Sequence, residues 1–236
     1  MGRIVAISSG DLESTKPLNA YALGMISGET RNVLFIGTAS HDASGYVENI
    51  NAAFSQLGCQ VRALNLTTKA YSAEEMQELL SWADILYVGG GDTIFMMNTW
   101  KRCGLDAALK DVYRRDSAVL MGISAGAMCW FRRGCTDSPL AEIREGEAYG
   151  WANNLLGIHD LAYCPHYEDR VADCNRLMQD TSLDCLAMES NTAFVEENGA
   201  IHFLKTTEAA KAYKLSYQHG RCEKEEIVVR LIRKEG

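Results

Sequence analysis

Short apolar runs alternate with segments of helical periodicity over the first two-thirds of the chain. Continuous apolar runs, as at 32–36 and 85–88, are typical of strands buried on both faces of a sheet. Segments such as 45–57 carry apolar residues at helical spacing, and Ser72 with Glu75 forms a capping-box pattern. We expect strands at 3–8, 32–36, 60–66, 85–88 and 117–121, and helices at 18–27, 45–57, 72–82, 94–101, 105–115 and 125–132. This alternation predicts an α/β fold, with a mostly parallel sheet and helices on both faces.

The last third of the chain has a different pattern. Strands are expected at 161–166 and 185–190, with a helix at 169–179 between them. Asn198-Gly199 and Gly220 mark turns between alternating segments, which is the pattern of antiparallel hairpins. No linker or internal repeat interrupts the sequence, so we predict a single domain over residues 1–236.

Composition and charge exclude several classes of function. The 236 residues are 47% hydrophobic, enough for a large core, and the net charge of −8 argues against a nucleic-acid surface. No apolar run is long enough to span a bilayer, and the start resembles a strand rather than a signal peptide, which favours a cytoplasmic protein. The eight cysteines show no Cys-x-x-Cys spacing, so free buried thiols are expected rather than a metal site.

Residues 122–127, Gly-Ile-Ser-Ala-Gly-Ala, are the most informative stretch. A serine between two glycines, after an apolar strand and before a helix, has the pattern of a nucleophile elbow. The turn lifts the hydroxyl of Ser124 out of the sheet and directs the N–H of Ala125 towards a developing oxyanion. A plain glycine-rich turn is the alternative interpretation of the same pattern.

A serine nucleophile needs a base, and the five histidines differ in their positions. His166 follows Pro165 at the carboxyl end of a predicted strand, the edge at which the elbow also lies, and it is the favoured base. A surface loop is expected for His41, a turn for His159 and a core or cross-strand position for His202; His219 lies in a late turn.

The base in turn needs a carboxylate that orients it. Glu189 ends a predicted strand at the same edge, whereas Asp137 lies in the loop that follows the elbow helix and precedes Pro139. We rank Glu189 first, and both stay open as the third residue.

Residues 89–93, Gly-Gly-Gly-Asp-Thr, follow a predicted strand. The segment lacks the Lys-Ser/Thr of a P-loop, so it is not a phosphate-binding loop of that kind. We predict that Gly90 or Gly91 provides the second oxyanion donor, and that Asp92 and Thr93 contact substrate. Tight packing of a strand on a helix also explains three glycines in a row.

Taken together, these motifs resemble those of the peptidase E and cyanophycinase family of serine peptidases. The resemblance covers about residues 3 to 205 and rests on five motifs in order: Gly89–Thr93, Gly122–Ala127, Asp137-Ser-Pro139, Pro165-His166-Tyr167 and Glu189-Ser-Asn191. It implies a fold like that of class I glutamine amidotransferases, with serine in place of their cysteine. The segment after His166 is shorter than in peptidase E, whose longer loop carries a substrate-binding arginine, and Arg170 is the basic residue that remains there.

The resemblance implies a serine peptidase that acts on short peptides, including dipeptides with an N-terminal Asp, without metal or cofactor. Ser124 is the expected nucleophile, His166 the base, and Glu189 or Asp137 the third residue. Two other interpretations stay open: an α/β-hydrolase esterase in which His219 is the base, and a non-catalytic binding module that keeps the elbow.

Overall fold

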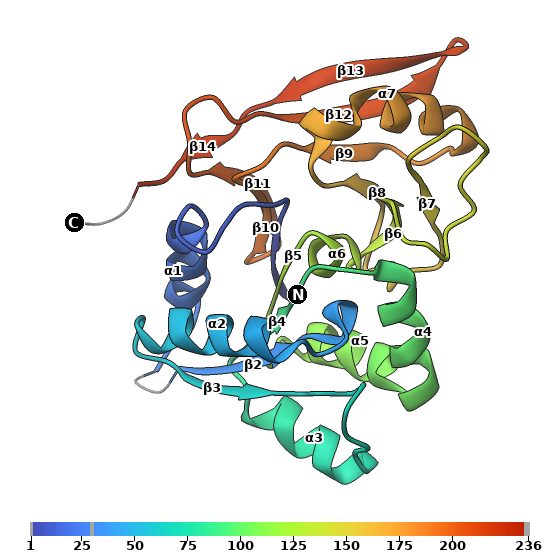
Figure 1. The fold of residues 1–236 in the computed structure, drawn as a ribbon. Helices are drawn as coiled ribbons and strands as arrows, with labels where there is room; N and C mark the ends of the chain where they lie inside the picture. Colours follow the sequence, from blue (N-terminus) through green and yellow to red (C-terminus); the bar gives the residue numbers. More distant parts are fainter. Residues whose placement is uncertain (1, 29–30, 234–236) are drawn as a thin grey trace.

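The computed structural model describes residues 2–28 and 31–233, and these residues form two β-sheets with helices between and around them (Figure 1). The larger sheet has eight strands in the order β14-β11-β10-β1-β5-β4-β2-β3. Its strands are β1 (Arg3–Ile7), β2 (Asn32–Ile36), β3 (Gln60–Ala63), β4 (Ile85–Val88), β5 (Val119–Ile123), β10 (Thr192–Glu197), β11 (Ala200–Lys205) and β14 (Arg230–Leu231). The run from β1 through β5, β4 and β2 to β3 is parallel, as the alternating pattern predicts, and β10 joins β1 antiparallel.

Helices cover both faces of this sheet. On one face, α1 (Lys16–Gly24) and α2 (Ser44–Ser55) pack apolar side chains such as Leu18 and Phe54 against β1 and β2. On the other face lie α3 (Ala73–Trp82), α4 (Thr93–Cys103) and α5 (Leu105–Arg115). The capping box that opens α3 is present, with both hydrogen bonds between Ser72 and Glu75.

A second sheet of six strands has the order β13-β12-β9-β8-β6-β7. Its strands are β6 (Phe131–Thr136), β7 (Gly150–Ala152), β8 (His159–Cys164), β9 (Cys185–Met188), β12 (Ala212–Gln218) and β13 (Arg221–Ile227). Side chains such as Tyr163 and Leu186 share a core with Ile4 and Ala6 of the larger sheet. The helix α7 (Tyr167–Leu177), followed by the short η2 (Met178–Asp180), packs on the opposite face, as Figure 1 shows.

The second sheet is the main departure from the sequence prediction. The helix expected at 125–132 ends early: α6 covers only Ala125–Met128, and the chain enters β6 at Phe131. Phe131 is fully buried, and its ring stacks on that of Tyr163 with centroids 4.5 Å apart, so packing between strands overrides the local helical preference. The two C-terminal hairpins are confirmed, and Asn198 and Gly199 both have positive φ, as a tight hairpin turn requires.

Across the described parts of the chain, helices that combine the length and the apolarity needed to cross a lipid bilayer are absent.

Candidate active site

Ser124 lies at the end of β5, and its backbone is held in an unusual conformation with φ 55° and ψ −113°. Glycine is required at positions 122 and 126, on either side of Ser124, because a side chain would have no space there. A Cβ on Gly122 would lie 2.2 Å from the carbonyl oxygen of Gly126, and a Cβ on Gly126 would lie 2.2 Å from that of Val88. The Gly-x-Ser-x-Gly pattern therefore reflects the close approach of three backbone segments, and the strained turn presents the serine at the end of its strand.

The hydroxyl of Ser124 meets His166. Ser124 Oγ and His166 Nε2 are 3.0 Å apart, within hydrogen-bond distance, and both side chains are half-buried. His166 follows β8 and precedes α7, and its φ of 52° is also left-handed. Because β8 belongs to the second sheet, the expectation that both residues lie on the edge of one sheet is corrected. The pair forms where the strand ends of the two sheets meet.

Ser8, which the sequence analysis did not single out, connects these two strand ends. It follows β1 and is fully buried, and its hydroxyl donates to the carbonyl oxygen of Met188 at 2.7 Å. The same oxygen atom of Ser8 accepts from the backbone N–H of His166 at 3.0 Å. Ser8 thus holds the His166 backbone against the larger sheet. Its position after a central strand is the only sequence signal for this role.

The environment of His166 favours a neutral imidazole. Burial lowers its pKa from the ordinary 6.5, and the positive charge of Arg170 lowers it further. The negative charges of Glu168, Asp169 and Asp137 act in the opposite direction. A neutral ring can accept a proton from a hydroxyl, so this His166 is suited to act as a general base near neutral pH.

Neither predicted third residue reaches the ring of His166. The carboxylate of Glu189 accepts the backbone N–H of Lys211 at 2.9 Å and lies 3.5 Å from the hydroxyl of Tyr213, so its partners lie at the start of β12. Asp137 is exposed in the loop after β6, and its negative charge raises the pKa of His166. Among residues 2–28 and 31–233, no carboxylate oxygen lies within 4.0 Å of a His166 ring nitrogen.

The glycine-rich loop after β4 lies against the elbow. A Cβ on Gly90 would lie 3.3 Å from that of Ser124, so the Gly90 backbone adjoins the nucleophile position. The N–H of Gly90 donates to the hydroxyl of Tyr46 at 3.3 Å. Gly91 has φ +135° and approaches the backbone of Ala39 so closely that a Cβ would lie 2.2 Å from its oxygen.

Other predicted contact residues have structural partners. Asp92 caps α4, accepting from the N–H groups of Ile94 and Phe95 at 3.0 Å each, and it also accepts the hydroxyl of Ser138. Thr93 is fully buried. Ala125 is the first residue of α6, where a backbone N–H has no partner within the helix and is free for a ligand.

Arg170, the predicted substrate contact, is directed into the core of the second sheet. It is 7% exposed, its Nη1 donates to the carbonyl oxygen of Cys135 at 2.6 Å, and its guanidinium lies 4.6 Å from the centre of the Tyr149 ring. It occupies the buried face of α7, together with Cys174 and Leu177. Its charge reaches His166, but its side chain does not lie at the surface of the site.

The other histidines have different surroundings. His159 is paired with the buried Glu196 at 3.1 Å. His202 lies 3.0 Å from the hydroxyl of Tyr21. His41 and His219 are exposed at turns. His166 is therefore the histidine of the described chain that is hydrogen-bonded to Ser124.

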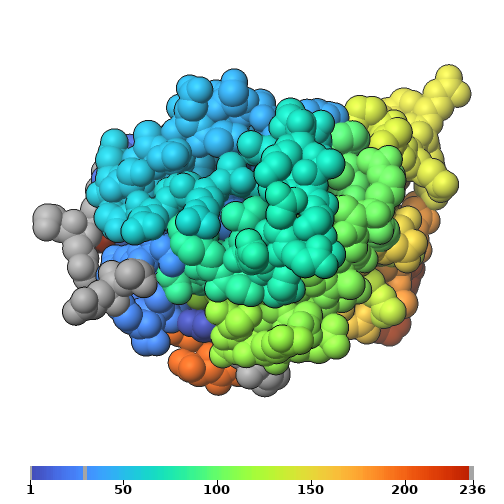
Figure 2. Space-filling model, turned by 90° about the horizontal axis from the view of Figure 1, so that it is seen from below, coloured from blue at the N-terminus to red at the C-terminus, as the bar shows by residue number. Residues whose placement is uncertain are grey.

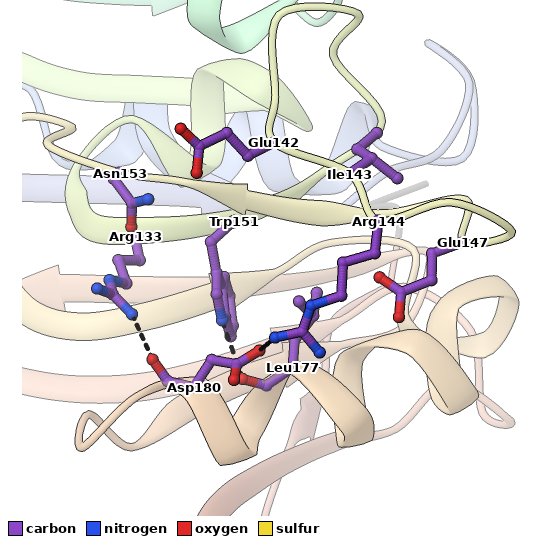
Figure 3. Close-up of a pocket in the computed structure, with 9 residues that line it drawn as sticks. All are labelled: Arg133, Glu142, Ile143, Arg144, Glu147, Trp151, Asn153, Leu177 and Asp180. Carbon is purple, nitrogen blue, oxygen red and sulfur yellow. Dashed lines mark hydrogen bonds and ion pairs between the residues drawn. The ribbon is translucent and has the colours of Figure 1, made fainter.

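Two of the pockets in the structure differ in their relation to Ser124. One, of about 550 Å³, lies beside the elbow and is lined by residues that include Gly10, Tyr46 and Ile123. Another, shown in Figure 3, lies between the segment that joins β6 to β7 and the end of α7; its walls are held by contacts of Arg133 and Arg144 with Asp180. The joining segment, yellow in Figure 2, stands out from the body of the molecule. None of the predicted site residues lines the pocket of Figure 3.

Comparisons with known proteins place the chain in one family. The model of peptidase family S51 matches residues 4–207. A protein of Bacillus subtilis strain 168 named uncharacterized peptidase YgaJ is 30% identical over 232 residues, which cover 91% of this chain and 92% of that protein. An uncharacterized peptidase of Listeria monocytogenes, Lmo0363, is 31% identical over 146 residues, or 59% of this chain and 67% of its own.

The fold is also found among solved structures. A peptidase from an acI-B1 Actinobacterium superimposes with a TM-score of 0.69 at 17% identity, covering 96% of this chain and 97% of its own. The family match extends over most of the chain and includes both halves of the Ser124–His166 pair. The chain belongs to peptidase family S51, the serine-type peptidases of the peptidase E and cyanophycinase group, whose fold is like that of class I glutamine amidotransferases.

Proposed function

We propose that the protein hydrolyses short peptides, with Ser124 as nucleophile and His166 as general base. The observation that carries this proposal is the 3.0 Å contact between Ser124 Oγ and His166 Nε2 at the end of a strained turn. The neutral imidazole takes the hydroxyl proton as the oxygen attacks the scissile carbonyl, and returns it to the leaving amine. Water then hydrolyses the acyl-enzyme with His166 acting as base once more.

The oxyanion of each tetrahedral intermediate needs two backbone donors. The N–H of Ala125 is at the first position of α6, where the helix dipole adds positive potential. Gly90 adjoins Ser124, and its N–H has only the long 3.3 Å bond to the Tyr46 hydroxyl, which a substrate oxygen can replace. Ala125 and Gly90 are therefore the proposed donors, and the tight contact of Gly91 with Ala39 makes Gly91 the weaker candidate.

We propose that negative charges acting through space support a protonated His166, those of Glu168 and Asp169 ahead of that of Asp137. The charge of Asp137 favours the imidazolium, whereas the carboxylate of Glu189 is engaged by Lys211 and Tyr213. In this arrangement Asp137 ranks above Glu189 as the third residue. The support acts through space, since Asp137 does not touch the ring.

Arg170 bears on substrate preference. To select an aspartyl side chain, a guanidinium must be accessible to the substrate, because it donates two parallel hydrogen bonds to a carboxylate. Arg170 is 7% exposed and bonded to the Cys135 carbonyl, so we propose a pocket without acidic selection. The wild type is expected to cleave Asp-Leu and Ala-Leu with kcat/KM values within about threefold of each other; a much larger preference for Asp-Leu would contradict this point alone.

The nucleophile is tested by Ser124→Ala. It should fold normally, lose activity on a dipeptide library by about 10³-fold or more, and lose labelling by a fluorophosphonate probe. The double variant Ser124→Ala/His166→Ala should lose little more activity than Ser124→Ala alone, because the effects of substituting residues that act as a unit are not additive. Labelling and turnover retained in Ser124→Ala would overturn the proposal. A wild type that neither turns over peptides nor labels would favour the binding-module interpretation.

The esterase alternative rests on His219. That residue lies in the exposed turn between β12 and β13, while the Ser124 hydroxyl is bonded to His166. The geometry therefore favours the peptidase.

A further inference from the structure

Three cysteine side chains meet in the core of the second sheet. Cys135 lies on β6, Cys164 on β8 and Cys174 on α7, and all three are fully buried. Their sulfur atoms all lie within 4.8 Å of one another. The cysteines are 29 and 10 positions apart in the sequence, so it is the fold that assembles them.

This spacing is somewhat wider than a bound metal ion requires. Zinc–sulfur bonds of about 2.3 Å in a tetrahedron place two sulfur atoms roughly 3.8 Å apart. A contraction of about an ångström or less would therefore bring the three thiols into one coordination sphere. A fourth buried thiol, that of Cys185 on β9, lies beside Cys174 but does not belong to this group of three.

Charge gives an independent indication. A buried guanidinium is costly without a negative partner. Arg170 is 7% exposed, its Nε has no hydrogen-bond partner, and within the described residues no carboxylate lies within 4.0 Å of it. Its charge acts on the Cys135 thiol, and it donates to the carbonyl oxygen of the same residue. The buried charge of Arg170 thus lies beside the three cysteines without a carboxylate to balance it.

We propose that Cys135, Cys164 and Cys174 bind a thiophilic divalent cation of the zinc class, with Arg170 as the balancing charge. Three thiolates and a divalent ion sum to −1, and the guanidinium brings the buried cluster to zero. Binding releases three thiol protons to solvent. Soft thiolate ligands select such ions over magnesium or calcium.

The proposed ion has a positioning role rather than a part in the reaction. Cys164 precedes His166 by two residues and Cys135 precedes Asp137 by two, so the ion would fasten the strands that present both residues. It would also tie α7, which follows His166, to the same point through Cys174.

The test is metal binding by the reduced, full-length protein. After chelation and exchange into metal-free buffer, Zn²⁺ or Cd²⁺ is added and unbound ion removed. The wild type is expected to retain about one ion per chain by elemental analysis, and Cd²⁺ should produce the ultraviolet thiolate-to-metal charge-transfer band. Cys174→Ala should lower retention at least tenfold. Cys59→Ala, which removes a buried thiol remote from the cluster, should leave retention unchanged.

A second measurement covers the case in which Cys174→Ala does not fold. Native mass spectrometry of the wild type should then show one Zn²⁺ bound with the loss of protons that thiolate ligation requires, and the Cd²⁺ band should be kept in Cys59→Ala. A wild type that retains neither ion, or that binds Cd²⁺ without the charge-transfer band, would overturn the proposal, and the thiols would then be ordinary apolar core residues. No readout involves hydrolysis, so failure here leaves the peptidase proposal untouched.

Discussion

Ser124 and His166 come from two parts of the molecule that are built under different constraints. The serine lies in a turn where a Cβ on Gly122 or Gly126 would come within 2.2 Å of a backbone oxygen, so its surroundings are fixed by segments close to it. The histidine follows a strand of the second sheet and is held by a hydrogen bond from its N–H to Ser8, far away in the sequence. The close approach of backbone segments within the larger sheet shapes the first part, and contacts between the two sheets shape the second.

The comparison implies that the two parts respond differently to substitution. Changes in the elbow should disturb folding and activity together, because the glycines that shape the turn also pack the core. Changes around His166 should alter the rate and its pH dependence with smaller losses of stability.

The largest effect on rate is expected from the histidine. His166→Ala should lower kcat/KM for a cleavable dipeptide by about 10³-fold or more while the protein stays folded, since no other histidine contacts Ser124. His219→Ala is the matched control, because His219 is exposed in a turn, and it should retain full activity. Steady-state kinetics with circular dichroism checks both. If His219→Ala were the inactive variant, the esterase arrangement would be correct.

Sequence alone predicted the elbow and its histidine partner because each has a local signature. Glycines flank Ser124, and Pro165 ends the strand before His166. The second sheet was not predicted, because the tendency of 125–132 to form a helix loses to the packing of Phe131 on Tyr163. The contacts of Ser8 and the cluster of Cys135, Cys164 and Cys174 join distant parts of the chain, and no spacing in the sequence indicates them.

Glu189 shows the same limit. Its place at the end of a strand favoured it over Asp137, but that strand is β9 of the second sheet, and β12 lies next to it. The N–H of Lys211 and the hydroxyl of Tyr213 then engage the carboxylate. The order of strands in a sheet decides which neighbouring strand provides hydrogen-bond donors to a carboxylate at a strand end. That order is not visible in the local sequence pattern.

The next largest effect concerns the elbow glycines. Gly126→Ala places a Cβ 2.2 Å from the oxygen of Val88, and the backbone must shift to relieve the contact. We expect a loss of about 3 kcal/mol in the free energy of unfolding, or roughly 10 °C in Tm, together with loss of activity. Thermal denaturation and kinetics measure the two. Gly24→Ala at the end of α1 is the control, since nothing lies within 4 Å of its Cβ, and it should be neutral or slightly stabilising. Equal behaviour of the two variants would show that the close approach is not required.

A smaller effect should distinguish the two carboxylates. Asp137→Asn removes a charge that favours the protonated His166, so kcat should fall by about five- to tenfold, well below the roughly 10⁴-fold of a carboxylate bonded directly to its histidine. Glu189→Gln should lower kcat by about twofold or less, because the Glu189 carboxylate accepts hydrogen bonds from the Lys211 N–H and the Tyr213 hydroxyl. The two amides are nearly isosteric with the acids, so a stability difference is not expected to obscure the kinetics. The reverse ranking would return Glu189 to the third position.

The smallest and most specific effect is a shift in pH dependence. His166 must be neutral to accept the Ser124 proton, so kcat/KM should be constant at neutral pH and fall as pH drops through the pKa of His166, which burial and then Arg170 hold below 6.5. Removing the positive charge with Arg170→Gln should raise that pKa and move the acid limb to higher pH. Asp137→Asn removes a charge that raises the pKa, so its acid limb should move to lower pH. The pH profiles of kcat/KM for the wild type and both variants test the signs. If the acid limb moved in the same direction in both variants, it would report the titration of a group other than His166. The base would then have to be sought among the other residues around Ser124.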